Sequence, residues 1–291
     1  MKITIEPTEK QLASWIDTFV PNQDLFLIEE ADLAYFEREL ADVLVVPRSE
    51  FMAHAVYKRL QLANSYMYWN IADRMSYVLV APPEWIERMA LQKKQHLLEV
   101  QAGSGRGLVF PAPMLPEAPE DFSIEWDGAA LIIMQYSWWK KLPIKIKKRF
   151  LKEYAVQWDS PECHELPANA PSHLQQFANR YSDSHGSNCL SATLFAVTGH
   201  AWMAGEWVHP ETFSHGLHRA NYSLIEKEAA PGDVVIWINH AGIVQHASFC
   251  LGNDLFFNKN GQTFFNPWKV IDENKLDREW SHLDKKVYSC R

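Results

Sequence analysis

The chain has 291 residues, of which 47% are apolar and 22% are charged, and its formal net charge is −8. These values are typical of globular proteins and exclude a mostly disordered chain. A mildly acidic chain is also a poor candidate for wrapping nucleic acid, because that function requires a basic face. Since a domain typically has ~150 residues, the length suggests two domains.

The cysteine content and the first residues bear on the compartment. The chain has four cysteines, too few and too scattered for a disulfide-stapled scaffold. Its first twenty residues contain neither the apolar core nor the small-residue cleavage site of a signal peptide. No stretch approaches the ~18 apolar residues of a membrane-spanning helix. The sequence therefore predicts a reduced, cytoplasmic protein that does not span a membrane.

The first half of the chain has the patterns of a mixed α+β domain. Short apolar runs indicate strands, and apolar residues at helical spacing indicate helices. In chain order we expect helix 8–19, strand 24–30, helix 31–41, strand 42–47, helix 48–65, strand 76–83, helix 84–101, strand 108–113 and strand 122–139. The glycine-rich segment 103–107 follows a helix and precedes a strand, an order that favours a helix C-cap and turn over a phosphate-binding loop.

A cluster of basic residues follows this half. Seven lysines and arginines lie between residues 140 and 152, at the start of an amphipathic helix. Such a cluster can meet an anionic partner, but a solvated helix face explains it more simply. We place the domain boundary here, which gives an N-terminal α+β domain of unknown role at 1–140 and a second domain at 141–291.

The second domain contains a cysteine in a position that suits catalysis. A run of polar, turn-forming residues, 182–188, leads directly into Cys189, and an apolar helix follows. The dipole and free N–H groups of a helix N-terminus favour a thiolate, so we expect a lowered pKa for Cys189. The same N–H groups can bind the oxyanion formed in acyl transfer. Taken alone, a small buried side chain at the start of a helix explains this cysteine equally well.

A meander of three strands follows. The pattern predicts strands at 233–238, 242–251 and 255–258, separated by turns rich in glycine and asparagine. Alternation places His246 on one face with Ser248 and Cys250, and Asn258 lies across the hairpin from His246. We expect the small Ser248 to let a helix pack beside His246. A cysteine on a helix with a histidine and an asparagine on two strands is the arrangement of nucleophile, base and orienting group.

These residues resemble the NlpC-type cell-wall peptidases, a superfamily of papain-like cysteine hydrolases. That family places its nucleophile in an Asp-Cys-Ser-Gly motif, where this chain has Asn-Cys-Leu-Ser at 188–191. A Pro-Gly-Asp-led strand follows in the family, as at 231–233 here, and then a His-x-Gly-Ile-Tyr-Leu-Gly strand, matched by 246–252. The third polar residue of the family falls at Asn258. The resemblance covers residues 165–290 and not the first half of the chain.

The resemblance implies a papain-like catalytic domain, with a helix carrying Cys189 packed on an antiparallel sheet. It implies Cys189 as nucleophile, His246 as base and Asn258 as orienting residue, and we expect no cofactor. Possible metal ligands occur at 162–165 and at His215 and His218, but zinc sites usually have tighter, paired spacings, so we expect no metal. The substrate would be a small peptide, such as a murein-derived fragment. Tyr181 is the nearest match to a family tyrosine upstream of the cysteine. Candidate substrate-binding residues are therefore Tyr181, Asn188, Trp202 and Trp207.

Several alternatives stay open. His240 also begins a His-x-Gly-Ile-like segment, but twelve residues later the chain has Gly252, which cannot orient an imidazole. The same site would support deamidation, transamidation or acyl transfer. A third possibility is a hydrolase-like fold kept as a non-catalytic binding module, for which a thiol pKa of ~8.5 or above would speak. The oligomeric state is not predicted.

Overall fold

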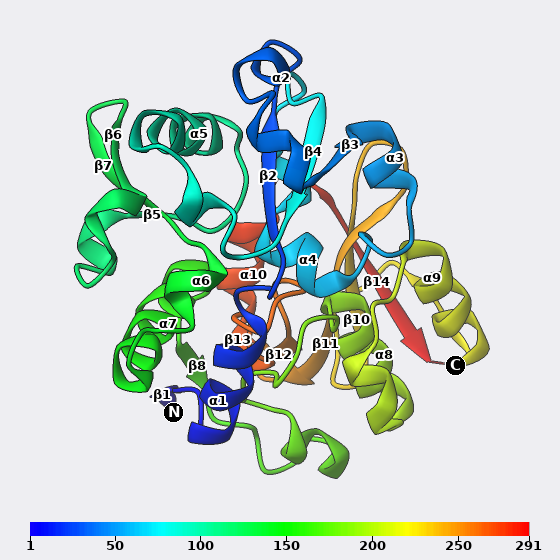
Figure 1. The fold of residues 1–291 in the computed structure, drawn as a ribbon. Coiled ribbons are helices and arrows are strands. Elements are labelled where there is room, and N and C mark those ends of the chain that lie inside the picture. Colours follow the sequence, from blue (N-terminus) through cyan, green and yellow to red (C-terminus); the bar gives the residue numbers. More distant parts are fainter. Residues whose placement is uncertain (291) are drawn as a thin grey trace. The chain divides into compact units, whose positions relative to one another are not determined.

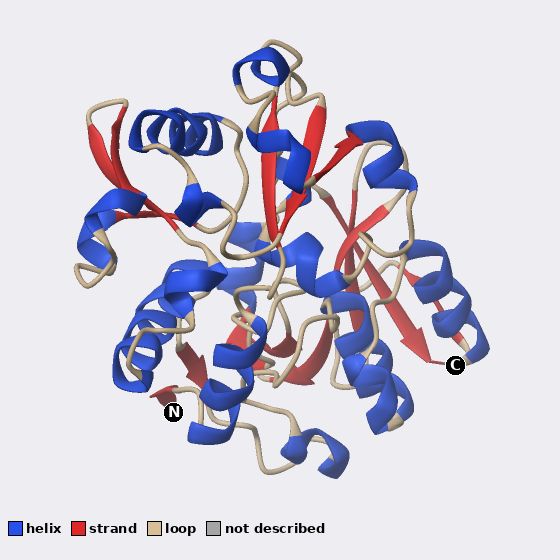
Figure 2. Cartoon of the chain, in the orientation of Figure 1, coloured by secondary structure: helices blue, strands red, loops and turns tan. Residues whose placement is uncertain are grey.

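The computed structural model describes residues 1–290 and has an α+β fold in which every paired strand is antiparallel. The chain forms two compact units, and each unit contains both helices and strands (Figures 1 and 2). Unit 2 is residues 14–153, whereas unit 1 combines residues 1–13 with residues 154–291. The boundary expected at residue 140 lies within unit 2, and residues 1–13 belong to unit 1, where Ile3 pairs with Cys163.

Unit 2 contains two three-stranded sheets, in the orders β2-β4-β3 and β5-β7-β6. Buried apolar residues fill β2 and β4, which explains why these strands were recognisable as short apolar runs. Its elements are β2 (Asp24–Ile28), α2 (Asp32–Tyr35), β3 (Leu44–Pro47), α3 (Arg48–Ala53), α4 (Leu60–Ser65), β4 (Tyr77–Ala81), α5 (Leu91–Gly103), β5 (Val109–Pro111), β6 (Ser123–Trp126), β7 (Ala129–Ile133) and α6 (Tyr136–Trp139). Helices α1 (Glu9–Thr18) and α7 (Ile144–Trp158) cross the division between the units.

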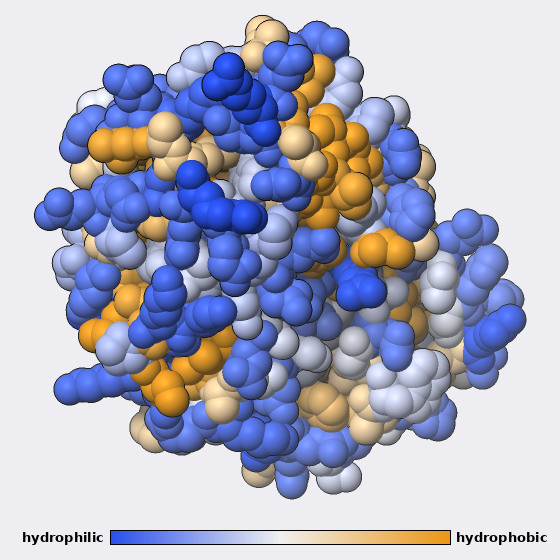
Figure 3. Space-filling view, viewed as in Figure 1, coloured by the Kyte–Doolittle hydropathy of each residue, from blue (hydrophilic) through white to orange (hydrophobic). Residues whose placement is uncertain are grey.

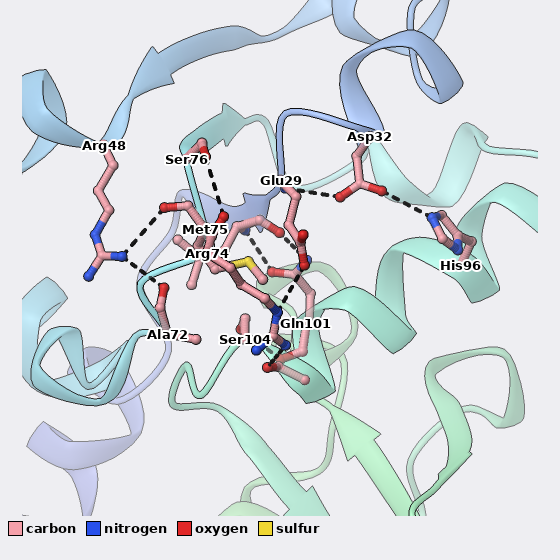
Figure 4. Close-up of polar contacts among 12 residues, drawn as sticks. Glu29, Asp32, Arg48, Ala72, Arg74, Met75, Ser76, His96, Gln101 and Ser104 are labelled. Carbon is pink, nitrogen blue, oxygen red and sulfur yellow. Dashed lines mark hydrogen bonds and ion pairs between the residues drawn. The ribbon is translucent and has the colours of Figure 1, made fainter.

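Side chains bind backbone groups at the ends of these strands in unit 2. The Arg48 guanidinium donates to the carbonyls of Ala72 and Met75 at 2.8 and 3.5 Å (Figure 4). Gln101 of α5 both donates to and accepts from the backbone of Leu27 in β2, each at 2.8 Å. The bonds of Gln101 satisfy backbone groups of the edge strand β2, and those of Arg48 satisfy carbonyls of the loop before β4.

Four expected elements of unit 2 differ from the structure. The helix expected at 84–101 is a 3₁₀ turn at Ile86–Arg88 followed by α5, which begins at Leu91. The helix expected at 31–41 is the single turn α2 followed by a short 3₁₀ turn, and the helix expected at 48–65 is split into α3 and α4. The long strand expected at 122–139 is the β6–β7 hairpin followed by α6. Asp127 and Gly128 form its turn with φ values of 49° and 76°, and an Asp-Gly pair is the common signal for such a hairpin.

Unit 1 is built on a six-stranded sheet with the order β13-β12-β11-β10-β14-β9. The expected meander is present, and its three strands lie side by side near the middle of this sheet. The elements are β1 (Lys2–Thr4), β8 (Glu162–His164), α8 (Cys189–Thr198), α9 (Pro210–Arg219), β9 (Tyr222–Ile225), β10 (Val234–Ile238), β11 (Val244–Gly252), β12 (Leu255–Asn258), β13 (Lys269–Asp272), α10 (Glu273–Glu279) and β14 (Asp284–Cys290).

The two faces of this sheet carry different cores. Helix α8 packs against β11 and β12, and its apolar residues join Ala247, Phe249 and Phe257 in one buried cluster. The residues that alternate with these on the strands form a second cluster with α10, which includes Trp237 and Cys250. Both faces are therefore covered, which explains why β10 and β11 consist of nearly continuous buried residues rather than alternating polar and apolar ones.

The N-terminus completes unit 1. Strand β1 pairs with β8, with Lys2 opposite His164 and Thr4 opposite Glu162. The amide of Gln11 in α1 donates to the Tyr181 carbonyl. Residues from the beginning of the chain therefore stabilise the segment that leads to Cys189.

The surface mixes charged and apolar residues. Figure 3 shows apolar side chains gathered over the region of β3 and α3 in unit 2, where Leu44 and Val56 are exposed. Within residues 1–290, no helix combines the length and the apolar character needed to cross a bilayer.

Candidate functional site

Cys189 is the first residue of α8, as expected. The preceding residue, Asn188, caps the helix: its side-chain oxygen accepts from the Ser191 backbone N–H at 3.0 Å, and the Ser191 hydroxyl accepts from the Asn188 backbone N–H at 2.9 Å. This reciprocal capping box satisfies two N–H groups of the first turn. It also fixes where the helix begins, and so fixes the position of the thiol.

The Cys189 thiol contacts the backbone of β11 at Gln245 and Ala247, the residues before and after His246. Its sulfur is 3.9 Å from the Gln245 carbonyl, to which it donates, and the backbone N–H of Ala247 hydrogen-bonds to it. Strand β12 pairs with β11 only from Phe249 onward, so this stretch of β11 has no strand partner on that side. The backbone N–H groups of Cys189 and Leu190 also point at the sulfur.

His246 and Asn258 form a buried pair. The Nε2 atom of His246 is 2.7 Å from the Oδ1 atom of Asn258, which confirms the expected contact across the hairpin. The Ser248 hydroxyl donates to the same oxygen at 2.6 Å. The ring of Trp280 stacks on the imidazole, with 4.2 Å between the ring centroids and 15° between the planes. This indole shields the hydrogen-bonded pair from water.

The thiol and the imidazole are neighbours along β11, but their side chains belong to different faces of the sheet. Cys189 packs in the α8 cluster with Ala247, whereas His246 contacts Trp237 and Trp280 on the α10 side. Within residues 1–290, no hydrogen bond joins the thiol to the imidazole. The shared face of His246, Ser248 and Cys250 is as expected, but α8 packs beside Ala247 and not beside Ser248. The alternation was right, and the face assigned to the helix was wrong.

The pKa values of Cys189 and His246 are set by burial. Burial raises the pKa of the Cys189 thiol to about 11, and it outweighs the opposing effect of the surrounding N–H groups. Burial likewise lowers the pKa of His246 to about 4, although the bond to Asn258 opposes that shift. The expected lowering of the cysteine pKa is therefore corrected: desolvation decides, because the sulfur is enclosed.

A buried lysine lies close enough to Cys189 to affect it. Lys259 follows Asn258 at the end of β12, and its ammonium donates to the carbonyls of Thr263 and Asn266. Its positive charge lowers the pKa of Cys189, while burial lowers its own pKa to about 7. The same charge helps to lower the pKa of His185, in the loop before Cys189, although burial is the larger cause.

Two of the expected substrate-binding residues, Asn188 and Tyr181, are held by contacts within unit 1. Both polar atoms of the Asn188 amide are engaged, because Nδ2 donates to the Val208 carbonyl at 2.7 Å while Oδ1 caps the helix. Tyr181 is buried. Burial raises the pKa of its hydroxyl to about 12, and the charges that add to this shift are those of Asp159, Cys163 and Glu6, not that of Cys189. The alternative base His240 lies in an exposed turn.

The two tryptophans line a cavity of about 630 Å³ between α8, α9 and the short 3₁₀ helix η7 (Ala201–Gly205). Trp202 is 66% exposed and Trp207 is 37% exposed, so both indoles are accessible. The cavity walls include Leu194 from the middle of α8 but not Cys189. Val208 connects the cavity with the N-terminus of α8, because it lines the cavity and its carbonyl accepts a hydrogen bond from Asn188.

Several residues of the site were not recognised from the sequence. Trp280 and Asn260 reach it from α10 and from the loop after β12, and neither belongs to a motif. Ser248 was noted only for its size, but its hydroxyl binds Asn258. Within residues 1–290, no group of three or more histidine, cysteine, aspartate or glutamate side chains is arranged to hold a metal ion.

Comparison with known proteins adds no relative. No protein-family profile, no curated protein and no solved structure matches this chain. The arguments on function below therefore rest on the residues and contacts described above.

Proposed function

We propose that unit 1 is a papain-like cysteine hydrolase that cleaves an amide bond in a small peptide, with Cys189, His246 and Asn258 as its catalytic set. One observation carries the proposal: the Cys189 thiol contacts the backbone of Gln245 and Ala247, the two neighbours of His246, and the His246 side chain is joined to Asn258 at 2.7 Å. A cysteine at a helix N-terminus, with a histidine and an orienting amide on the adjacent strands, supplies the groups that acyl transfer requires.

The reaction requires that the His246 imidazole and the Cys189 thiol, which lie on different faces of the sheet, come into contact. Cys189 Sγ then attacks the amide carbonyl carbon while His246 Nδ1 takes the thiol proton. The backbone N–H groups at the start of α8 stabilise the oxyanion. His246 then gives the proton to the leaving amine, and a thioester remains on Cys189. Water attacks the thioester with His246 as base, which releases the carboxylic acid and restores the thiol. Because both side chains are neutral at rest, proton transfer accompanies the attack and does not precede it.

The cavity beside α8 suits the substrate's apolar part. Its volume of about 630 Å³ and its exposed indoles, Trp202 and Trp207, are those of a ligand pocket. The link through Val208 to Asn188 favours a ligand that extends from this cavity toward Cys189. By resemblance, a murein-derived peptide containing D-amino acids is the substrate to test first.

A second candidate is a binding module that keeps the hydrolase fold without catalysis. The observation that favours it is the thiol pKa of about 11, far above that of a thiolate nucleophile. In that case the aromatic cavity is the functional site, and Cys189 is a buried core residue.

The experiment that tests catalysis compares wild type with Cys189→Ala on murein-derived peptides, with products identified by mass spectrometry. We expect the substitution to lower the rate about a thousandfold or more, because the thioester cannot form. The matched control is Cys290→Ala, which removes an exposed cysteine outside the site and leaves hydrolysis unchanged. Hydrolysis that persists in Cys189→Ala would overturn the proposal, and cavity binding without hydrolysis in wild type would favour the binding module.

A further inference from the structure

A chain of polar side chains leads from His246 to two carboxylates. Asn258 Nδ2 donates to Asn260 Oδ1 at 2.6 Å. Asn260 Nδ2 in turn donates to Glu279 Oε2 at 3.2 Å and to Asp159 Oδ1 at 3.5 Å. The buried ammonium of Lys269 lies 2.5 Å from Asp159 Oδ1, and this ion pair fixes the position of the carboxylate.

The hydrogen bonds along this series of side chains run in one direction, because the side chains differ in whether they can donate a hydrogen. The Asp159 carboxylate, in its ion pair with Lys269, only accepts hydrogen bonds, so Asn260 must turn its NH₂ group toward it and toward the adjacent Glu279. Asn260 then presents its oxygen to Asn258, and Asn258 must donate through Nδ2. The oxygen of Asn258 is left for Ser248 and His246, and it can only accept. His246 must therefore carry its proton on Nε2.

We propose that the carboxylates of Asp159 and Glu279 set the tautomer of His246 through the amides of Asn260 and Asn258, and that Asn260 is a positioning residue. A neutral imidazole has one lone pair, and this tautomer puts it on Nδ1, the nitrogen that is not bonded to Asn258. The inference matters for catalysis only if the proposed function is right, because Nδ1 is the atom that would take the Cys189 proton. The tautomer itself can be measured without a substrate.

Two substitutions of Asn260 test whether the direction of these hydrogen bonds, and not only the presence of a polar side chain at this position, sets the tautomer of His246. Aspartate at this position only accepts, so Asn260→Asp loses the bonds to Asp159 and Glu279 but still accepts from Asn258 Nδ2 and keeps the proton of His246 on Nε2. Lysine only donates, and it is attracted to Asp159 and Glu279, so Asn260→Lys turns the Asn258 amide and moves the proton to Nδ1. Asn260→Leu serves if the lysine variant does not fold; it releases the Asn258 amide, so the fraction of His246 protonated on Nε2 falls.

The measurement is a long-range ¹H–¹⁵N correlation spectrum of the imidazoles at neutral pH. The chain has 12 histidines, and His246→Gln identifies the signals of His246 by their loss. Asp277→Asn, which neutralises a carboxylate of the same helix outside the chain of amides, leaves the tautomer unchanged. A folded lysine or leucine variant with the wild-type tautomer would overturn the inference, as would a wild type protonated on Nδ1. Failure of the proposed function gives a different result: Cys189→Ala retains hydrolysis, while the tautomers of the wild type and the Asn260 variants are those expected.

Discussion

At the scale of single residues, the state of Cys189 is decided by two opposing effects on one sulfur atom. Three backbone N–H groups and the charge of Lys259 favour the thiolate, and enclosure by the α8 cluster favours the thiol. Enclosure prevails and raises the pKa to about 11, while His246 stays neutral down to about pH 4. Both side chains are therefore neutral, with the thiol on one face of the sheet and the imidazole on the other, and they do not form the ion pair that the helix terminus alone would suggest.

This ionisation predicts how alkylation of Cys189 depends on pH. Because the pKa is raised, the thiolate fraction at neutral pH is small, and it increases about tenfold per pH unit until the pKa is reached. We expect the iodoacetamide reaction rate at Cys189 to follow that rise from about pH 6 to about pH 10. Mass spectrometry of the Cys189 peptide measures the rate separately from that of the other cysteines.

The exposed Cys290 provides the internal comparison for this experiment, because it reacts in the same sample. Cys290 is expected to react faster at every pH below about 9. A rate at Cys189 that is already constant from about pH 5 to about pH 8 would contradict the prediction, and would mean that the thiol had transferred its proton to His246.

At the scale of elements, the start of α8 depends on one amide. Asn188→Ala removes the cap and the bond to Val208, so we expect the free energy of unfolding to fall by about 1 to 2 kcal/mol. Asn188→Asp is the matched control, because a carboxylate still caps the helix, and it isolates the bond to Val208. Urea unfolding followed by circular dichroism measures both. Equal losses in the two variants would show that the cap contributes nothing.

The elements recognised from the sequence are those with one dominant signal. The short apolar runs of β2, β4 and β12 and the polar-to-apolar step at Cys189 each specify an element locally. The broken helices α3 and α4 had apolar spacing without end signals, so they were joined. The β6–β7 hairpin had its signal, Asp127-Gly128, but the apolar residues on both sides of this pair hid it.

The candidate site divides in the same way. The contact between His246 and Asn258 follows from strand alternation and hairpin length, and both are local properties. Which face α8 covers depends on packing between segments more than forty residues apart, and a shift of one position reverses it. The pKa of Cys189 was misjudged for the same reason, since burial is a property of the assembled core. Trp280 and Asn260 belong to no local motif, and only the tertiary fold brings them to the site.

At the scale of the whole molecule, unit 1 is made of both ends of the chain. Strand β1 supplies the partner of β8, so deleting residues 1–5 removes that pairing while leaving all of unit 2 in place. We expect faster amide hydrogen exchange at 162–164 in the shortened chain, since those backbone groups lose their partners. Strands β2 and β4 lie wholly within unit 2 and serve as the internal control, with unchanged exchange. Slow exchange at 162–164 after the deletion would show that β8 is held without β1, and faster exchange in β2 and β4 would show that the two units do not respond separately.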